Sequence, residues 1–167
     1  MKEGSGLLGS GPWGLLYDPT DGVAADLARE FGQLAPSLGI RPLIEASRAA
    51  ATDGPQLERL LARGARVIYL PPAASAGRYA PLLLDWGRRL KVKVVSGYPE
   101  GPHQGALIWL ALDYRRLGTE TAALARRVLQ GESPRDIPIA QMTPISLVVD
   151  EKLLQQWSGY PPPRPVP

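Results

Sequence analysis

The side chains that could carry catalysis are sparse in this sequence. It contains no cysteine, which excludes thiol nucleophiles, thiolate metal sites and disulfides. His103 is the only histidine, and it lies among the prolines and glycines of residues 101–105. A triad with a histidine base, or a metal site with two histidines, is therefore not expected. No glycine-rich loop ending in Lys-Ser or Lys-Thr is present, which removes the usual nucleoside triphosphate site.

Three carboxylates stand where strands are predicted to end: Asp18, Glu45 and Asp113. Paired carboxylates can act as general acid and base, but helix caps and turns use the same residue types. Asp113 closes an apolar strand and opens a long helix, which is the position of an N-cap. The alternative is that Asp113 and Tyr114 face a ligand, as an acceptor and a stacking ring. We expect no catalytic residue, no enzymatic activity, no metal and no cofactor.

One glycine motif matches a cofactor fingerprint by its letters alone. Residues 9–14 read GSGPWG, which fits the dinucleotide pattern. That pattern binds a pyrophosphate only where it follows a strand and begins a helix. Here the glycines precede a strand, so we interpret residues 1–12 as a flexible leader.

Length and composition predict one folded unit. A chain of 167 residues that is 44% apolar can bury one hydrophobic core. No apolar run is long enough for a transmembrane helix, and none of signal-peptide length is visible at the start. The net charge of +3 is small and the basic residues are spread out, so nucleic acid is not an expected partner.

Hydrophobic periodicity predicts short strands that alternate with longer helices. Strands are expected at residues 13–17, 40–46, 65–70, 91–96, 106–112 and 145–149, and Pro42 suggests that the second is an edge strand. Asp21 is the expected N-cap of the first helix and Asp53 that of the second, which has Pro55 in its first turn. Further helices are expected at residues 78–90, 114–130 and 151–157. In the helix at 78–90 the expected buried residues are Leu82, Leu83, Trp86 and Leu90.

This alternation predicts an α/β fold with a single doubly wound, mostly parallel sheet of the flavodoxin-like kind. Residues 13–157 form the expected lobe, and the proline-rich residues 158–167 form an extended tail. Ligands of such folds bind at the carboxyl ends of the strands. That edge is predicted to include Asp18, residues 45–47, residues 71–75, residues 96–98, Asp113 and Tyr114.

The segment from Gly105 onward resembles a known family. Residues 105–107 read GAL, residues 111–114 read ALDY, residues 117–121 read LGTET and residues 131–138 read GESPRDIP. This order resembles the ABC-transporter substrate-binding family that includes tryptophan and other amino-acid binders, and so does the strand LVVD at 147–150. The resemblance continues more loosely upstream, in YDP at 17–19, LGI at 38–40 and VIYLP at 67–71, and it covers residues 13–157.

The sequence departs from the family pattern in three ways. Family members are about twice this size and close two lobes on a ligand, whereas one lobe is expected here. A polar cluster after the third strand is replaced by PAAS at residues 72–75. The acidic residue expected near Gly97 is absent, and SGYP stands at residues 96–99.

The resemblance implies the solute-recognition component of an ABC-type importer, or a degenerate single-lobe relative, that binds a small solute such as an amino acid. Its ligand-binding residues are expected to be Asp18, Ser75, Ser96, Tyr98, Asp113 and Tyr114. The expected partners are that solute, an ABC permease and a second copy of the chain, and the expected location is extracytoplasmic, either periplasmic or membrane-attached. The alternative is a non-catalytic protein-interaction module on the same lobe that has lost its ligand.

Overall fold

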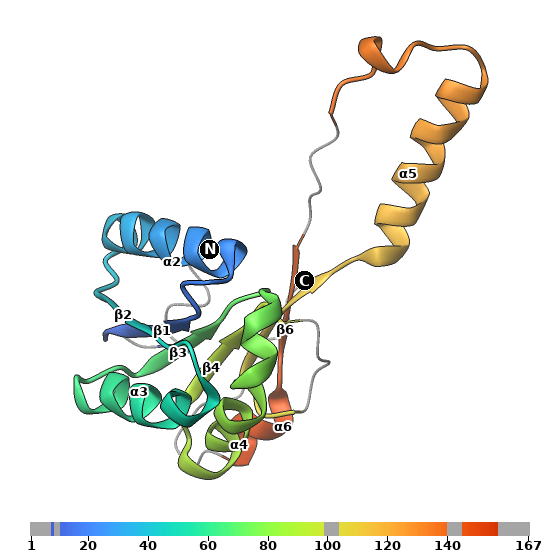
Figure 1. Ribbon diagram of the computed structural model, residues 1–167. Coiled ribbons are helices and arrows are strands. Elements are labelled where there is room, and N and C mark those ends of the chain that lie inside the picture. The colour runs from blue at the N-terminus through green and yellow to red at the C-terminus, as the bar shows by residue number, and fades with distance from the viewer. Residues whose placement is uncertain (1–7, 9–10, 99–103, 140–144, 157–167) are drawn as a thin grey trace. The chain divides into compact units, whose positions relative to one another are not determined.

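A computed structural model describes residue 8 and residues 11–98, 104–139 and 145–156 (Figure 1). Two compact units are present: residues 1–110 together with 148–167, and residues 111–147. Each unit is described by itself. Most of the predicted leader, His103 and the whole predicted tail lie outside the described residues.

The strands form one six-stranded sheet in the order β2-β1-β3-β4-β5-β6. The strands are β1 (Trp13–Tyr17), β2 (Pro42–Ala46), β3 (Val67–Leu70), β4 (Lys93–Ser96), β5 (Ile108–Leu112) and β6 (Ile145–Val149). The pairs β1–β2, β1–β3, β3–β4 and β4–β5 are all parallel. The N–H of Asp150 donates to the carbonyl of Leu107 at 3.0 Å, so the end of β6 meets the beginning of β5. The predicted α/β fold with a mostly parallel sheet is confirmed, and β2 is an edge strand as Pro42 suggested.

Helices cover both faces of this sheet. The α-helices are α2 (Gly22–Leu34), α3 (Ala50–Ala62), α4 (Ala80–Leu90), α5 (Tyr114–Leu129) and α6 (Glu151–Gln156), and the 3₁₀-helices are η1 (Ala35–Leu38), η2 (Ala74–Arg78) and η3 (Pro134–Asp136). Side chains alternate along β3: Ile68 and Leu70 join the core with α3 and α4, whereas Val67 and Tyr69 face the other side. Figure 1 shows α2 on the opposite side of the sheet from α3 and α4.

The core on the α3 and α4 side is closed by a contact between two glycines. A Cβ on Gly87 of α4 would lie 2.1 Å from the carbonyl oxygen of Gly105, and one on Gly105 would lie 1.9 Å from that of Leu84. Gly105 also has a φ of +120°, a conformation that side chains rarely adopt. The absence of side chains at both positions lets α4 lie directly against the segment that enters β5.

Two local predictions are wrong. Helix α3 begins at Ala50 instead of Asp53, because Ala49 is its N-cap and the Ala49 carbonyl accepts the N–H and the hydroxyl of Thr52 at 2.9 and 2.8 Å. Asp53 is instead buried inside the helix. Leu90 was expected to be buried but is 61% exposed. It is the last residue of α4, directly before a left-handed turn at Lys91, and the chain leaves the core there.

Candidate functional site

The short helix η2 brings the carboxyl ends of three neighbouring strands together. It follows β3, and the N–H of its Ser75 donates to Asp21, four residues beyond β1, at 2.9 Å. Beyond β4, the hydroxyl of Tyr98 lies over Gly77, where an added Cβ would be 2.6 Å from that oxygen. Parallel strands present their carboxyl ends at one edge, so these contacts gather side chains from distant segments at a single rim.

Arg78 at the end of η2 is the centre of a charged network. Its Nη1 donates to Asp18 at 2.8 Å, and its Nε and Nη2 donate to the two carboxylate oxygens of Asp53 at 2.8 and 3.2 Å. Nη2 also donates to the carbonyl oxygen of Ser47, directly after β2, at 3.0 Å. The fork of the guanidinium suits such bidentate pairing. One side chain therefore ties the ends of β1 and β2 and the first turns of α3 to η2.

Hydrogen bonds lower the pKa of two carboxylates of the rim, Asp18 and Asp21. The hydrogen bond from Arg78, followed by those from Thr20, lowers the pKa of Asp18 to about 2. The backbone N–H of Ser75 is the main cause of a lowered pKa at Asp21, and the hydrogen bonds to Asp53 and Asp18 raise the pKa of Arg78. Arg78 pairs with Asp18 and Asp53, and the third carboxylate, Asp21, accepts backbone N–H groups instead. These three carboxylates outnumber the one guanidinium, which leaves the rim with an excess of negative charge.

Tyr98 is fixed from both sides at the end of β4. Its N–H donates to the hydroxyl of the buried Ser96 at 3.2 Å, and its carbonyl accepts the indole N–H of Trp109 at 3.0 Å. Gly97, which lies between Ser96 and Tyr98 in the chain, donates its N–H to the carbonyl oxygen of Leu70 at 2.8 Å. The Tyr98 ring is therefore a partly exposed aromatic surface in a defined position beside η2.

Four of the six predicted site residues come together here. Asp18 and Ser96 are 5% and 3% exposed and lie beneath the rim, whereas Ser75 and Tyr98 are partly exposed at it.

The other two, Asp113 and Tyr114, belong to the unit of residues 111–147. The Asp113 carboxylate accepts the N–H of Arg116 at 2.9 Å, which confirms its predicted N-cap role. Tyr114 is 65% exposed. Their membership of the rim stays a prediction.

The sequence did not identify Arg78 or Asp53 as parts of this rim. Arg78 was assigned to the start of a helix and Asp53 to a cap, because each residue type is common in those places. Arg78 is 60 residues from Asp18 and 25 from Asp53 along the chain, so no local pattern links them. Asp21 was identified through its capping role, but its bond to Ser75 was not.

The described residues contain no group of three or more His, Cys, Asp or Glu side chains placed to hold a metal ion. None of their helices is both long and apolar enough to cross a membrane.

The sequence matches the family model described as ABC transporter substrate binding protein over residues 13–158. A tyrosine-binding protein of Clostridioides difficile is 26% identical over 89 residues, which are 53% of this chain and 26% of that protein.

Solved structures share the fold at low sequence identity. A ligand-free, open substrate-binding protein with adhesive properties from Clostridium difficile has a TM-score of 0.77 at 20% identity, over 92% of this chain and 52% of that one. A conserved domain protein from Vibrio cholerae has a TM-score of 0.67 at 20% identity, and a protein from Streptococcus pneumonia in complex with L-Trp has 0.66 at 19%, each over 87% of this chain and 49% of the other. The chain spans about half the length of these proteins.

Proposed function

Because the chain belongs to the ABC transporter substrate-binding protein family, we propose that it recognises an amino acid for an ABC-type importer. Two of the matched proteins support this class of ligand, one described as tyrosine-binding and the other solved with L-Trp. The proposed role is capture and delivery to an ABC permease outside the cytoplasm, without catalysis. The comparisons favour this role over an interaction module that has lost its ligand.

The rim around η2 is the proposed binding surface, and its charge is the observation that carries the proposal. An excess of carboxylates over guanidinium attracts the α-ammonium group of an amino acid. Asp21 and Ser75 are both partly exposed, and the Asp21 carboxylate accepts the backbone N–H of Ser75. We therefore assign the ammonium group of the solute to Asp21 and Ser75.

The side chain of the solute is assigned to Tyr98. An aromatic or apolar side chain gains contact area on a ring that is already held in place, so little conformational entropy is lost on binding. Asp18 and Ser96 are buried and are proposed to position their neighbours. The Asp18 carboxylate accepts a hydrogen bond from Arg78, and the Ser96 hydroxyl accepts one from the backbone N–H of Tyr98. Asp113 and Tyr114 are proposed as further contacts from the other unit.

A rim on one lobe covers a solute on one side only. Small-molecule sites usually bury most of the ligand surface, and two-lobed proteins achieve this by closing around it. We therefore expect the chain alone to bind weakly, and to bind more tightly when a second surface faces the rim.

Calorimetric titration of the purified chain with L-Tyr, L-Trp and a panel of other amino acids tests the proposal. We expect saturable binding of at least one of them, lost in Tyr98→Ala and largely kept in Tyr98→Phe, which retains the ring. Leu129→Ala, at a position 87% exposed on α5, is the control and should bind like the unchanged chain. A folded chain that binds no amino acid, or Tyr98→Ala that binds normally, would show the assignment to be wrong.

A further inference from the structure

Arg78 has no free edge with which to bind the carboxylate of a solute. It donates four hydrogen bonds, through Nε and Nη2 to Asp53, through Nη1 to Asp18, and through Nη2 to the carbonyl oxygen of Ser47. A guanidinium binds a carboxylate most strongly when two parallel N–H groups are available on one edge. The existing bonds leave only the second N–H of Nη1, so a ligand cannot be bound in this bidentate way.

Asp21 is the acid of the rim that a solute meets. Asp18 and Asp53 are 5% and 3% exposed, and both pair with Arg78. Asp21 is partly exposed, and its carboxylate accepts the backbone N–H groups of Ser75 and of the first turn of α2. Backbone N–H groups carry partial charge only, so they stabilise this carboxylate without neutralising it. A solute at the rim therefore faces a negative charge whose hydrogen-bond partners among the described residues are uncharged.

The hydroxyl of Ser75 is a second polar group at this position. Ser75 is partly exposed as a residue, but its Oγ atom is buried and has no hydrogen-bond partner within the described part of the chain. A buried hydroxyl without a partner is costly, so a ligand that supplies one gains affinity. An ammonium group carries several N–H donors and can serve Asp21 and this hydroxyl together. An ionised carboxylate has no donor to offer, and its charge opposes that of Asp21.

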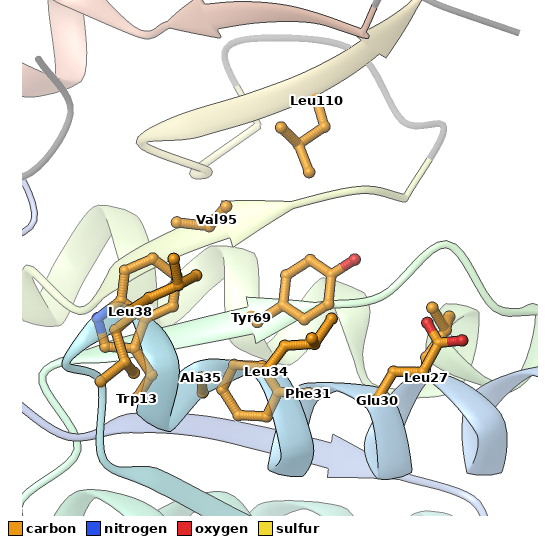
Figure 2. A pocket seen from close by; sticks show the side chains of 11 residues that line it. Trp13, Leu27, Glu30, Phe31, Leu34, Ala35, Leu38, Tyr69, Val95 and Leu110 are labelled. Carbon is orange, nitrogen blue, oxygen red and sulfur yellow. The ribbon is translucent and has the colours of Figure 1, made fainter. Parts of the chain in front are cut away.

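The groove on the α2 side of the sheet offers no cation to a carboxylate either (Figure 2). It has a volume of about 320 Å³, and Glu30 is the only charged residue in its lining. Figure 2 shows Glu30 on α2 together with the apolar side chains of Phe31 and Leu34. Glu30 follows the N-cap Asp21 by nine residues, which is about 13 Å along a helix. It is therefore an acid of the same helix that lies away from the rim.

We propose that the rim selects a positively charged amine and disfavours an α-carboxylate, so that the chain alone prefers an aromatic amine or an amino-acid amide to the free amino acid. This inference rests on the proposed function and names the part of the solute that the rim recognises. The ammonium group lies at Asp21 and Ser75, the side chain lies on the Tyr98 ring, and the carboxylate points away from the rim. A free amino acid gains from its carboxylate only where a facing surface supplies a cation.

The first test compares ligands that differ at one group. L-Tyrosine and L-tyrosinamide, and L-tryptophan and L-tryptophanamide, are titrated into the chain in a calorimeter at about pH 6, where the amines are protonated. Each amide should bind about tenfold more tightly than its amino acid, because the charge that opposes Asp21 is gone. 3-(4-Hydroxyphenyl)propanoate, which lacks the ammonium group, should not bind.

Two results of this comparison would count against the inference in different ways. Amino acids that bind more tightly than their amides would overturn the selection for amines while leaving the proposed function intact. They would point to a cation that reaches the solute, such as the exposed Arg48 in the loop after β2. A folded chain that binds none of the amino acids or amides would overturn the proposed function itself.

The second test assigns the selection to one acid. Asp21→Asn removes the charge but keeps an oxygen that can cap α2. This variant should bind L-tyrosinamide about tenfold more weakly, and the advantage of the amide over L-tyrosine should shrink with it. Glu30→Gln removes the same charge from the groove and should change neither quantity. A full preference for the amide in Asp21→Asn, or its loss in Glu30→Gln, would overturn the assignment.

Discussion

Replacing Arg78 by methionine should destabilise the chain substantially, because it removes the one group that bridges Asp18 and Asp53. The substitution keeps an apolar stem of similar length but deletes four hydrogen bonds. Asp53 is 3% exposed and would be left as a buried carboxylate without its partner. Breaking a buried pair in this way costs about 3–5 kcal/mol, and because the Arg78 side chain is 25% exposed we expect the lower end, about 3 kcal/mol.

Urea unfolding followed by circular dichroism measures this loss. Arg88→Met is the matched control, because Arg88 is 53% exposed and lies 3.6 Å from Asp85, and such surface pairs contribute about 0–1 kcal/mol. We expect a clearly lower unfolding midpoint for Arg78→Met and little change for Arg88→Met. Equal effects in the two variants would refute the reasoning.

Acidification gives a second check on the same pair. The pKa of Asp18 is lowered from 3.8 to about 2 in the folded chain, so its contribution to stability is present above pH 3.8 and is lost as the pH falls toward 2. Arg78→Met removes the main cause of that lowering. The stability gap between the unchanged chain and the variant should therefore narrow over this pH window, and a gap that stays constant would contradict the assignment.

Two further substitutions, Gly105→Ala and Tyr79→Phe, test the packing of the core, and Gly118→Ala serves as a comparison outside it. Gly105→Ala would place a Cβ 1.9 Å from the carbonyl oxygen of Leu84 and should lower the midpoint of thermal unfolding by several degrees, whereas Gly118→Ala meets nothing within 4 Å and should raise the helicity of α5 by circular dichroism. Tyr79→Phe deletes the hydroxyl that donates to the carbonyl of Leu16 at 2.6 Å in the core, and it should cost about 1–2 kcal/mol in urea unfolding. Unchanged stability in either destabilising variant would mean that the backbone relaxes around it.

The sequence determined the order and type of the elements. Apolar runs such as Val67–Leu70 are short and bounded by glycine or proline, so they could be assigned to strands from local pattern alone. Alternation of these strands with helices then implied a parallel sheet, and parallel strands end at one edge. For this reason the meeting of Asp18, Ser75, Ser96 and Tyr98 at one rim could be predicted before any coordinates were known.

Helix starts and buried positions were less well determined. Asp53 followed by Pro55 has the composition of a helix beginning, yet the helix begins three residues earlier at Ala50. Leu90 continues the apolar spacing of α4 but lies where the chain leaves the core. Local composition indicates which residues are able to cap a helix or to be buried. The position of an element relative to its neighbours decides which of these residues are capping or buried in the fold.

Tertiary structure alone decided the role of Arg78. The Arg78 guanidinium reaches Asp18 and Asp53 because η2 folds against the ends of β1 and β2. Arg78 is separated from them by 60 and 25 residues in the sequence, so no local sequence pattern predicts these contacts. Local patterns specify residue type and spacing, whereas the partner of a side chain such as Arg78 depends on loop lengths and on the three-dimensional path of the chain.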